Sequence, residues 1–284
     1  MTVFWGSNFT VVKVAVREIP ELPFNSLRLL VASAAFLLTI GLREGAPRLS
    51  RAEWGRIVLL GIVGQVIYQL CFLGAVARTT IANSALIFAF TPIVVALLTA
   101  AMGHERIPLT RWVGALISLG GIYLVVGAAR GPGATLAGDL LAIGAMLCWA
   151  MYTVGGQPML ATRSPVLVTG YSMTVGSLLY LPIALPGLRY LEWTSVRWEA
   201  WAALVLSGLL SMYVSYMIWY TAVHTIGSTR TSMYSNITPL VAMVVAYIYL
   251  GEPITTAKII GAAAVVLGLA VSRLERRVMP PVET

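Results

Sequence analysis

Two cations inside apolar stretches are the residues with the most evident chemistry. Lys13 lies within the first such stretch and Arg28 just inside the second. A buried cation in a bilayer is costly unless it faces a partner or a water-filled cavity. An inward-facing Lys13 would attract a carboxylate, whereas a snorkelling Lys13 would reach the outer headgroups, and both interpretations stay open. Arg28 is nearer its helix end, and we expect it to snorkel.

Amide and aromatic side chains inside the apolar stretches supply the rest of a candidate site. An amide facing lipid would leave its donors unsatisfied, so Asn8, Gln65 and Asn236 are expected to face the interior. Aromatic walls with amides and one cation suit an amphipathic zwitterion. The mid-segment candidates are Asn8, Gln65, Tyr68, Gln69, Asn83, Trp149, Tyr152, Gln157, Tyr171, Tyr216, Trp219, Tyr234 and Asn236.

Carboxylates are missing from the interiors of the apolar stretches. All 11 acidic residues fall in joints or at segment ends, so a proton-coupled exporter of cationic drugs lacks its expected buried acid. Cys71 and Cys148 have no metal-ligand spacing. With His104 and His224 as the only histidines, no catalytic constellation is evident. We therefore expect no enzyme activity, no metal and no cofactor.

The composition indicates a membrane protein. Of the 284 residues, 58% are hydrophobic and 11% charged, whereas soluble proteins carry about 25% charged residues. The mean hydropathy is +0.85. The net charge of +8 fits basic residues gathered in cytoplasmic loops. No basic run is long enough for a nucleic-acid arm, so no nucleic-acid partner is expected.

Ten apolar segments follow one another with short joints between them. Crossing a bilayer takes about 20 residues, and residues 1–18 barely reach that length, so that helix is short or the natural start lies upstream. The sequence predicts an all-α integral membrane protein. The segments are 1–18, 24–42, 55–77, 81–102, 110–129, 136–160, 166–187, 199–223, 229–250 and 256–273.

An internal repeat divides the chain into residues 1–130 and 131–284. A displacement of 147 positions brings Trp54 onto Trp201 without a gap, and the same displacement matches further residues. Five crossings per half would make the copies antiparallel, a common plan for secondary transporters with a site between the halves. The further matched pairs are Gly61 with Gly208, Ala75 with Ala222, Thr91-Pro92 with Thr238-Pro239, Glu105 with Glu252, Gly114 with Gly261 and Gly121 with Gly268; with small indels upstream, Trp5 aligns with Trp149.

The remaining signals concern orientation, hinges and packing. An excess of arginine in alternate joints favours both termini in the cytoplasm.

Pro92 and Pro239, near the middle of the fourth and ninth segments, are expected to loosen their helices, either as hinges or as static bends. Small residues at helical spacing, such as Gly114 with Ser118, predict close helix packing. We expect a monomer in membrane lipid.

Several stretches together resemble the drug/metabolite transporter superfamily, specifically its EamA-type exporters with two five-helix repeats. They are FWGSNFTVVK (Phe4–Lys13), SLRLLVA (Ser26–Ala32), the FTP and ITP stretches around Pro92 and Pro239, GHERIP and LGEPIT. The resemblance implies ten transmembrane helices as two inverted repeats around a central cavity, in a bacterial inner membrane. By motif, Trp5, Asn8 and Lys13 would line the cavity, and so would their repeat counterparts Trp149, Tyr152 and Gln157.

The resulting hypothesis is export of amino acids, aromatic or hydrophobic ones first, or of similar small metabolites by alternating access. An organic-phosphate or nucleotide-sugar exchanger is the alternative transporter, which a basic cluster in the cavity would favour. A membrane-embedded enzyme is the alternative from another class.

Overall fold

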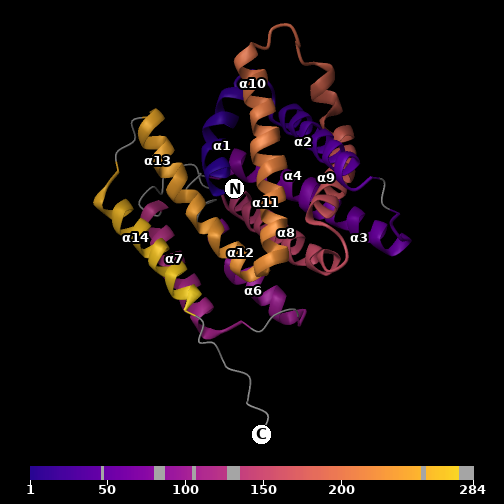
Figure 1. Cartoon of the computed structure of the whole chain (residues 1–284). Helices are drawn as coiled ribbons and strands as arrows, with labels where there is room; N and C mark the ends of the chain where they lie inside the picture. The colour runs from indigo at the N-terminus through magenta and orange to yellow at the C-terminus, as the bar shows by residue number, and fades with distance from the viewer. Residues whose placement is uncertain (46–47, 80–86, 104–106, 127–134, 251–253, 275–284) are drawn as a thin grey trace.

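A computed structural model describes residues 1–45, 48–79, 87–103, 107–126, 135–250 and 254–274 (Figure 1). The described part is helical throughout. Its elements are α1 (Thr2–Ala15), α2 (Glu21–Arg43), α3 (Arg51–Gly61), η1 (Ile62–Ile67), α4 (Tyr68–Arg78), α6 (Thr91–Ala101), α7 (Leu109–Val126), α8 (Leu136–Leu160), α9 (Pro165–Arg189), α10 (Trp198–Leu206), η3 (Ser207–Val214), α11 (Ser215–Ile226), α12 (Ser228–Tyr234), η4 (Ser235–Ile237), α13 (Thr238–Leu250) and α14 (Thr256–Arg273).

Six helical stretches in the described part are long and apolar enough to cross a bilayer. They are Glu21–Arg43, Arg51–Ala75, Leu136–Leu160, Pro165–Arg189, Trp198–Ile226 and Ser228–Tyr249. Three further apolar helices, Thr91–Ala101, Leu109–Leu124 and Thr256–Ser272, are shorter. A multi-pass membrane protein is therefore confirmed. Ten crossings stay a prediction.

Two of the long helical stretches contain a π-helical segment. Residues Ile62–Ile67 separate α3 from α4, and Ser207–Val214 separate α10 from α11. A π turn widens the helix and shifts the faces on either side, and such turns concentrate at functional sites. The displacement of 147 positions that defines the sequence repeat brings η1 onto η3.

Helices α7 and α14 pack more closely than ordinary side chains would allow. A Cβ atom at Gly121 would lie 2.5 Å from the carbonyl oxygen of Gly261, and a Cβ at Gly268 would lie 2.5 Å from that of Gly114. The Ser118 hydroxyl donates to the carbonyl oxygen of Val265 at 3.3 Å. The predicted small-residue packing is confirmed, and it joins two helices of one chain. Figure 1 shows this pair beside α13 on one side of the molecule.

The α-helical geometry is interrupted just before each of the two prolines. Pro92 is the second residue of α6, and Pro239 is the second residue of α13, directly after the 3₁₀ turn η4. A proline in the first turn removes no intrahelical hydrogen bond. Pro239 nevertheless lies in the middle of the longer stretch Ser228–Tyr249, where the 3₁₀ turn η4 separates α12 from α13. The hinge role stays a prediction.

Two ion pairs join helix ends. The Glu18 carboxylate accepts from the backbone N–H and the Nε of Arg197 at 2.7 and 2.6 Å, which connects the turn after α1 to the start of α10. Glu53 accepts from Arg163 Nε at 2.6 Å, which connects the first turn of α3 to the turn after α8. Hydrogen bonds from Arg197 lower the pKa of Glu18 below its usual 4.5, the backbone N–H contributing most.

Candidate functional site

Trp149, on α8, is the centre of an aromatic cluster. Its ring centroid lies 5.1 Å from that of Trp219 and 5.3 Å from that of Tyr216, both on α11. Tyr68 on α4 and Trp5 on α1 follow at 5.5 and 5.6 Å. Tyr152 lies one turn further along α8, at 5.7 Å. We call Trp5, Tyr68, Trp149, Tyr152, Tyr216, Trp219 and Tyr220 the aromatic cluster.

Hydrogen bonds hold these rings in fixed orientations. The indole N–H of Trp5 donates to the carbonyl oxygen of Ser211 at 2.9 Å. That of Trp219 donates to the Thr153 hydroxyl at 3.2 Å. The Tyr220 hydroxyl donates to the Tyr152 carbonyl at 2.6 Å. Buried indole and phenol groups need such partners, so the polar atoms of the cluster are positioned as well as its apolar faces.

The rings occupy the space where an open central cavity was expected. Trp219 and Tyr152 have no exposed surface, and Trp149 is 6% exposed. In the described part of the chain, the centre of the bundle is thus filled by aromatic side chains in this conformation. Trp5 and Tyr68, at the edge of the cluster, are only partly buried.

Arg28 does not snorkel, and that prediction is wrong. Its side chain is 5% exposed. The guanidinium donates to Asn25 Oδ1 at 2.8 Å, to Gln69 Oε1 at 3.2 Å and to Ser207 Oγ at 3.4 Å. It also lies 5.4 Å from the centre of the Phe24 ring. Neutral acceptors from three segments keep Arg28 inside the protein, because they offer closer partners than the headgroups do.

Unpaired amide groups surround this arginine. Asn25 Nδ2, Gln69 Nε2 and both polar atoms of Gln65 are buried without a hydrogen-bond partner. Gln65 lies beside the hydroxyls of Tyr152 and Tyr216, but not in hydrogen-bond geometry. Asn25 approaches the hydroxyl of Tyr180 in the same way. Buried polar groups without partners are uncommon in native proteins and mark places that call for an explanation.

The structure brings together some of the predicted site residues. The Asn8 side chain accepts from the Ser207 hydroxyl at 2.8 Å, so Asn8 is one bond removed from Arg28. Gln65 is fully buried on η1 beside the aromatic cluster. Together with Trp5, Tyr68, Trp149, Tyr152 and Trp219, these residues form one continuous region.

Other predicted residues lie elsewhere. Gln157 accepts from the Ser228 hydroxyl at 3.2 Å, at the contact of α8 with α12. Tyr234 packs with Ala89 and Met233 in a separate apolar cluster, and Asn236 is buried on η4 with Nδ2 unpaired. Asn83 and the side chain of Lys13 lie outside the described residues, so their predicted roles stay predictions.

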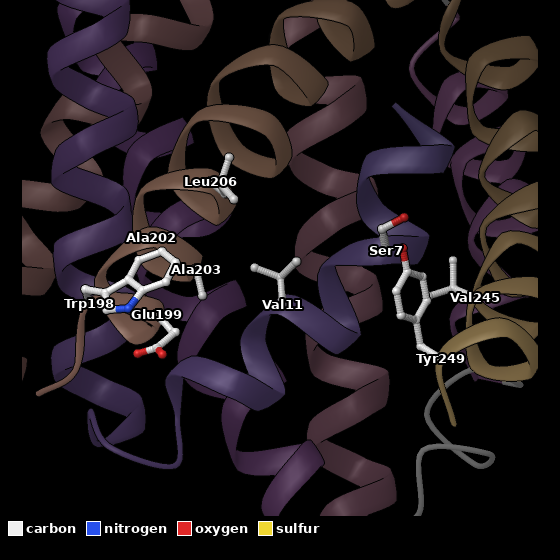
Figure 2. A pocket seen from close by; sticks show the side chains of 9 residues that line it. All are labelled: Ser7, Val11, Trp198, Glu199, Ala202, Ala203, Leu206, Val245 and Tyr249. Carbon is white, nitrogen blue, oxygen red and sulfur yellow. The ribbon is translucent and has the colours of Figure 1, made fainter. Parts of the chain in front are cut away.

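A groove opens on the flank of the bundle between α1, α10 and α13 (Figure 2). Its volume is about 410 Å³, within the size range of small-molecule sites. Oε2 of Glu199 is buried there without a hydrogen-bond partner. Figure 2 shows Ser7 and Tyr249 across the groove from Trp198. The lining residues are Ser7, Val11, Trp198, Glu199, Ala202, Ala203, Leu206, Val245 and Tyr249.

Sequence reasoning missed the arginine network and one aromatic residue. Tyr220 fits only because Gly156, on the facing helix, has no side chain to collide with its phenol. A glycine opposite a tyrosine is a signal only once the pairing of the helices is known. Asn25, near the start of α2, and Ser207, inside the span Trp198–Ile226, are short polar residues that carried no signal of their own.

The described residues form helices and no strands, and six of their helical stretches are long and apolar enough to span a membrane. The sequence profile of the EamA-like transporter family matches residues 1–127 and again 136–274. The chain belongs to this family of transporters.

Its relatives are similar over nearly their whole length. An uncharacterized transporter of Archaeoglobus fulgidus is 27% identical over 267 residues, covering 94% of this chain and 93% of the relative. The uncharacterized transporter YyaM of Bacillus subtilis is 24% identical and covers 94% and 89%. A probable terminal-alkyne amino-acid exporter of Streptantibioticus cattleyicolor is 26% identical and covers 94% of this chain and 89% of the relative.

A solved crystal structure of another protein has the same fold. Its TM-score is 0.82 at 20% identity, covering 96% of this chain and 95% of the other.

Proposed function

We propose that this transporter exports amino acids, aromatic or hydrophobic ones first, or similar small zwitterionic metabolites by alternating access. The observation that carries the proposal is the aromatic cluster around Trp149, which adjoins the polar network of Arg28. Such a region offers an apolar surface to the side chain of an amino acid and polar groups to its amino and carboxylate groups. The name of the Streptantibioticus relative, a probable amino-acid exporter, supports the same substrate class.

Alternating access requires two halves that can exchange roles, and we propose that they are inverted five-helix repeats. The crossing of α7 and α14 supports this arrangement. Gly114 faces Gly268 and Gly121 faces Gly261, so the two helices run in opposite directions. Ser118 bonds to Val265, a residue 147 positions away, which is also the displacement of the sequence repeat. Equivalent residues meet at that point, as a twofold axis between the halves would require.

The placement in the membrane follows the arginine distribution. We propose ten crossings, a bacterial inner membrane and both termini in the cytoplasm. In this orientation the groove of Figure 2 lies toward the outer face, because α10 begins there. The groove and the aromatic cluster would then be successive points on the exit route.

A phosphate or nucleotide-sugar exchanger is less well supported. Such substrates carry several negative charges and call for clustered cations. In the described part of the chain, the buried cations are Arg28 and Arg111, and Arg111 lies on α7, which packs mainly on α14. One arginine beside an aromatic cluster suits a single carboxylate better.

Uptake into liposomes containing the purified protein tests the proposal. Labelled phenylalanine, leucine and a sugar phosphate are supplied outside, with unlabelled compound inside and with or without a pH gradient. We expect saturable accumulation of the amino acids above that in protein-free liposomes. Accumulation of the sugar phosphate alone, or of none of the three, would contradict the proposed substrate class.

A further inference from the structure

The charge on Arg28 has no counterion in the described part of the chain. Its three hydrogen-bond acceptors are two amide oxygens and one hydroxyl oxygen, all neutral. Arg28 lies seven residues into α2, about 10 Å along the helix axis at 1.5 Å per residue. A full positive charge at that depth is costly unless it is compensated. The network solvates the cation but leaves the region electropositive.

The amide groups that bind Arg28 solvate it with their oxygens and do not neutralise its charge. Asn25 and Gln69 both direct their oxygens toward the guanidinium. Their NH₂ groups must therefore point away from it, and both are buried without a partner. A buried donor without an acceptor costs free energy comparable to a lost hydrogen bond. The guanidinium is therefore the group in this network that carries charge, and an anion is the ligand complementary to it.

The polar network continues directly into the aromatic cluster. Gln69 follows Tyr68 in the chain, and the Tyr68 ring contacts Trp149. On the other side Ser207 links Arg28 to Asn8 on α1, the helix that also carries Trp5. The electropositive end and the apolar end of the region thus lie on the same helices.

We propose that Arg28, a buried cation without a counterion in the described part of the chain, binds the carboxylate of the transported solute. The assignment rests on the proposed function and specifies it: the site takes a monocarboxylate whose apolar part lies against the aromatic cluster. Arg28 replaces Lys13 as the residue we assign to the carboxylate. A guanidinium suits this task because its planar N–H groups match the two oxygens of a carboxylate.

The test compares solutes that differ only in the carboxylate. Purified protein in detergent is titrated with L-phenylalanine, L-phenylalaninamide and phenethylamine, and ligand binding is measured as thermal stabilisation. We expect the wild type to bind phenylalanine at least about tenfold more tightly than either analogue, since hydrogen bonds to charged groups exceed neutral ones by that order. In Arg28→Gln the advantage of the acid should shrink to about twofold or less, and Arg28→Lys should restore part of it.

A second variant covers the case in which Arg28→Gln does not fold. Gln69→Glu keeps the shape of the side chain and gives Arg28 an internal carboxylate. The acid should then lose its advantage over the amide, while the unfolding temperature stays the same or rises. Ser33→Ala is the matched control, because it removes a buried hydrogen bond of α2, to Ser177 at 3.2 Å, without touching the arginine. It should keep the preference for the acid.

The outcomes separate this assignment from the proposed function. A wild type that binds the acid and the amide equally well, or a Gln69→Glu variant that still prefers the acid, overturns the role of Arg28 while amino-acid transport can stand. A wild type that neither binds nor takes up any of the amino acids overturns both.

Discussion

Trp149 contacts more of the aromatic cluster than any of the other rings described here, through Trp5, Tyr68 and the tyrosines and tryptophan of α8 and α11. Its indole, carried by α8, packs against rings of α1 and α4 in the first half and of α11 in the second. Ring pairs at these separations add to the free energy of burial. Trp149 therefore contributes both to the stability of the fold and to the proposed site. Substitutions that remove the ring or keep a smaller one measure its contribution to stability.

Replacing Trp149 by alanine should lower the free energy of unfolding by about 3–5 kcal/mol, the usual effect of removing a large buried aromatic side chain. Trp149→Phe keeps a ring and should lose about half as much or less. Unfolding of the detergent-solubilised protein, followed by circular dichroism, measures both. A Trp149→Ala variant as stable as the wild type would show that the indole is not packed as described.

At the scale of single residues, the sequence predicted which polar residues are buried better than it predicted their hydrogen-bond partners. That Gln65 would be buried followed from the cost of an amide in lipid, and the structure buries it fully. Arg28 could not be predicted in the same way, because its position near a helix end allows snorkelling equally well. What decides its orientation is Gln69 and Ser207, which are distant in the chain and meet it only after folding.

Among the helices, the α7–α14 crossing depends on backbone contact at small residues. In a bilayer, helices associate through packing rather than through a hydrophobic driving force, so close approach is the main source of their attraction. Gly114 and Gly121 provide it on α7, and Gly261 and Gly268 on α14. The residue next to one of them, Gly120, has open space where a Cβ would lie.

This difference between neighbours gives a matched pair of variants. Gly121→Val should separate α7 from α14 and lower the unfolding temperature markedly, because the side chain would collide with the Gly261 carbonyl and the Val265 backbone. Gly120→Val places the same side chain in open space and should change that temperature little. Thermal unfolding in detergent compares them. Equal effects of the two substitutions would mean that the close approach at Gly121 does not hold the helices together.

Most helices were predictable from sequence because spanning length and apolar composition follow from the thickness of the bilayer. The predicted 136–160 is the observed Leu136–Leu160, and 256–273 is Thr256–Arg273. The π segments η1 and η3 were not predicted. Apolar composition does not distinguish a π turn from an α turn, because both satisfy the backbone within the helix.

On the scale of the whole molecule, the two ion pairs occupy corresponding places in the two halves. Glu18–Arg197 joins the turn after α1 to the start of α10, and Arg163–Glu53 joins the turn after α8 to the start of α3. The repeat aligns α1 with α8 and α3 with α10, so one connection recurs with the charges exchanged. In the proposed topology the pairs lie on opposite membrane faces, where each would tie the two halves together.

The Glu18 pair predicts a pH effect whose sign follows from its lowered pKa. A carboxylate with a lowered pKa in the folded state stabilises that state above its ordinary pKa and loses this contribution as the pH falls. The unfolding temperature of the wild type should therefore drop below about pH 4.5 by more than that of Glu18→Gln, which has no proton to gain. Melting curves at a series of pH values compare the two proteins. Parallel curves would contradict a contribution from this pair.

The polar surroundings of Arg28 have a consequence for how the chain enters the membrane. Gln69 and Ser207 belong to later helical stretches, so Asn25 is the one hydrogen-bond partner of the three that enters the membrane in the same helix as Arg28. Arginine at the centre of an inserting helix carries a penalty of about 2.5–3.5 kcal/mol, and less toward its ends. The second helix must therefore be accepted by the insertion machinery with its guanidinium poorly solvated. The groups that later receive it arrive only with the remainder of the polypeptide.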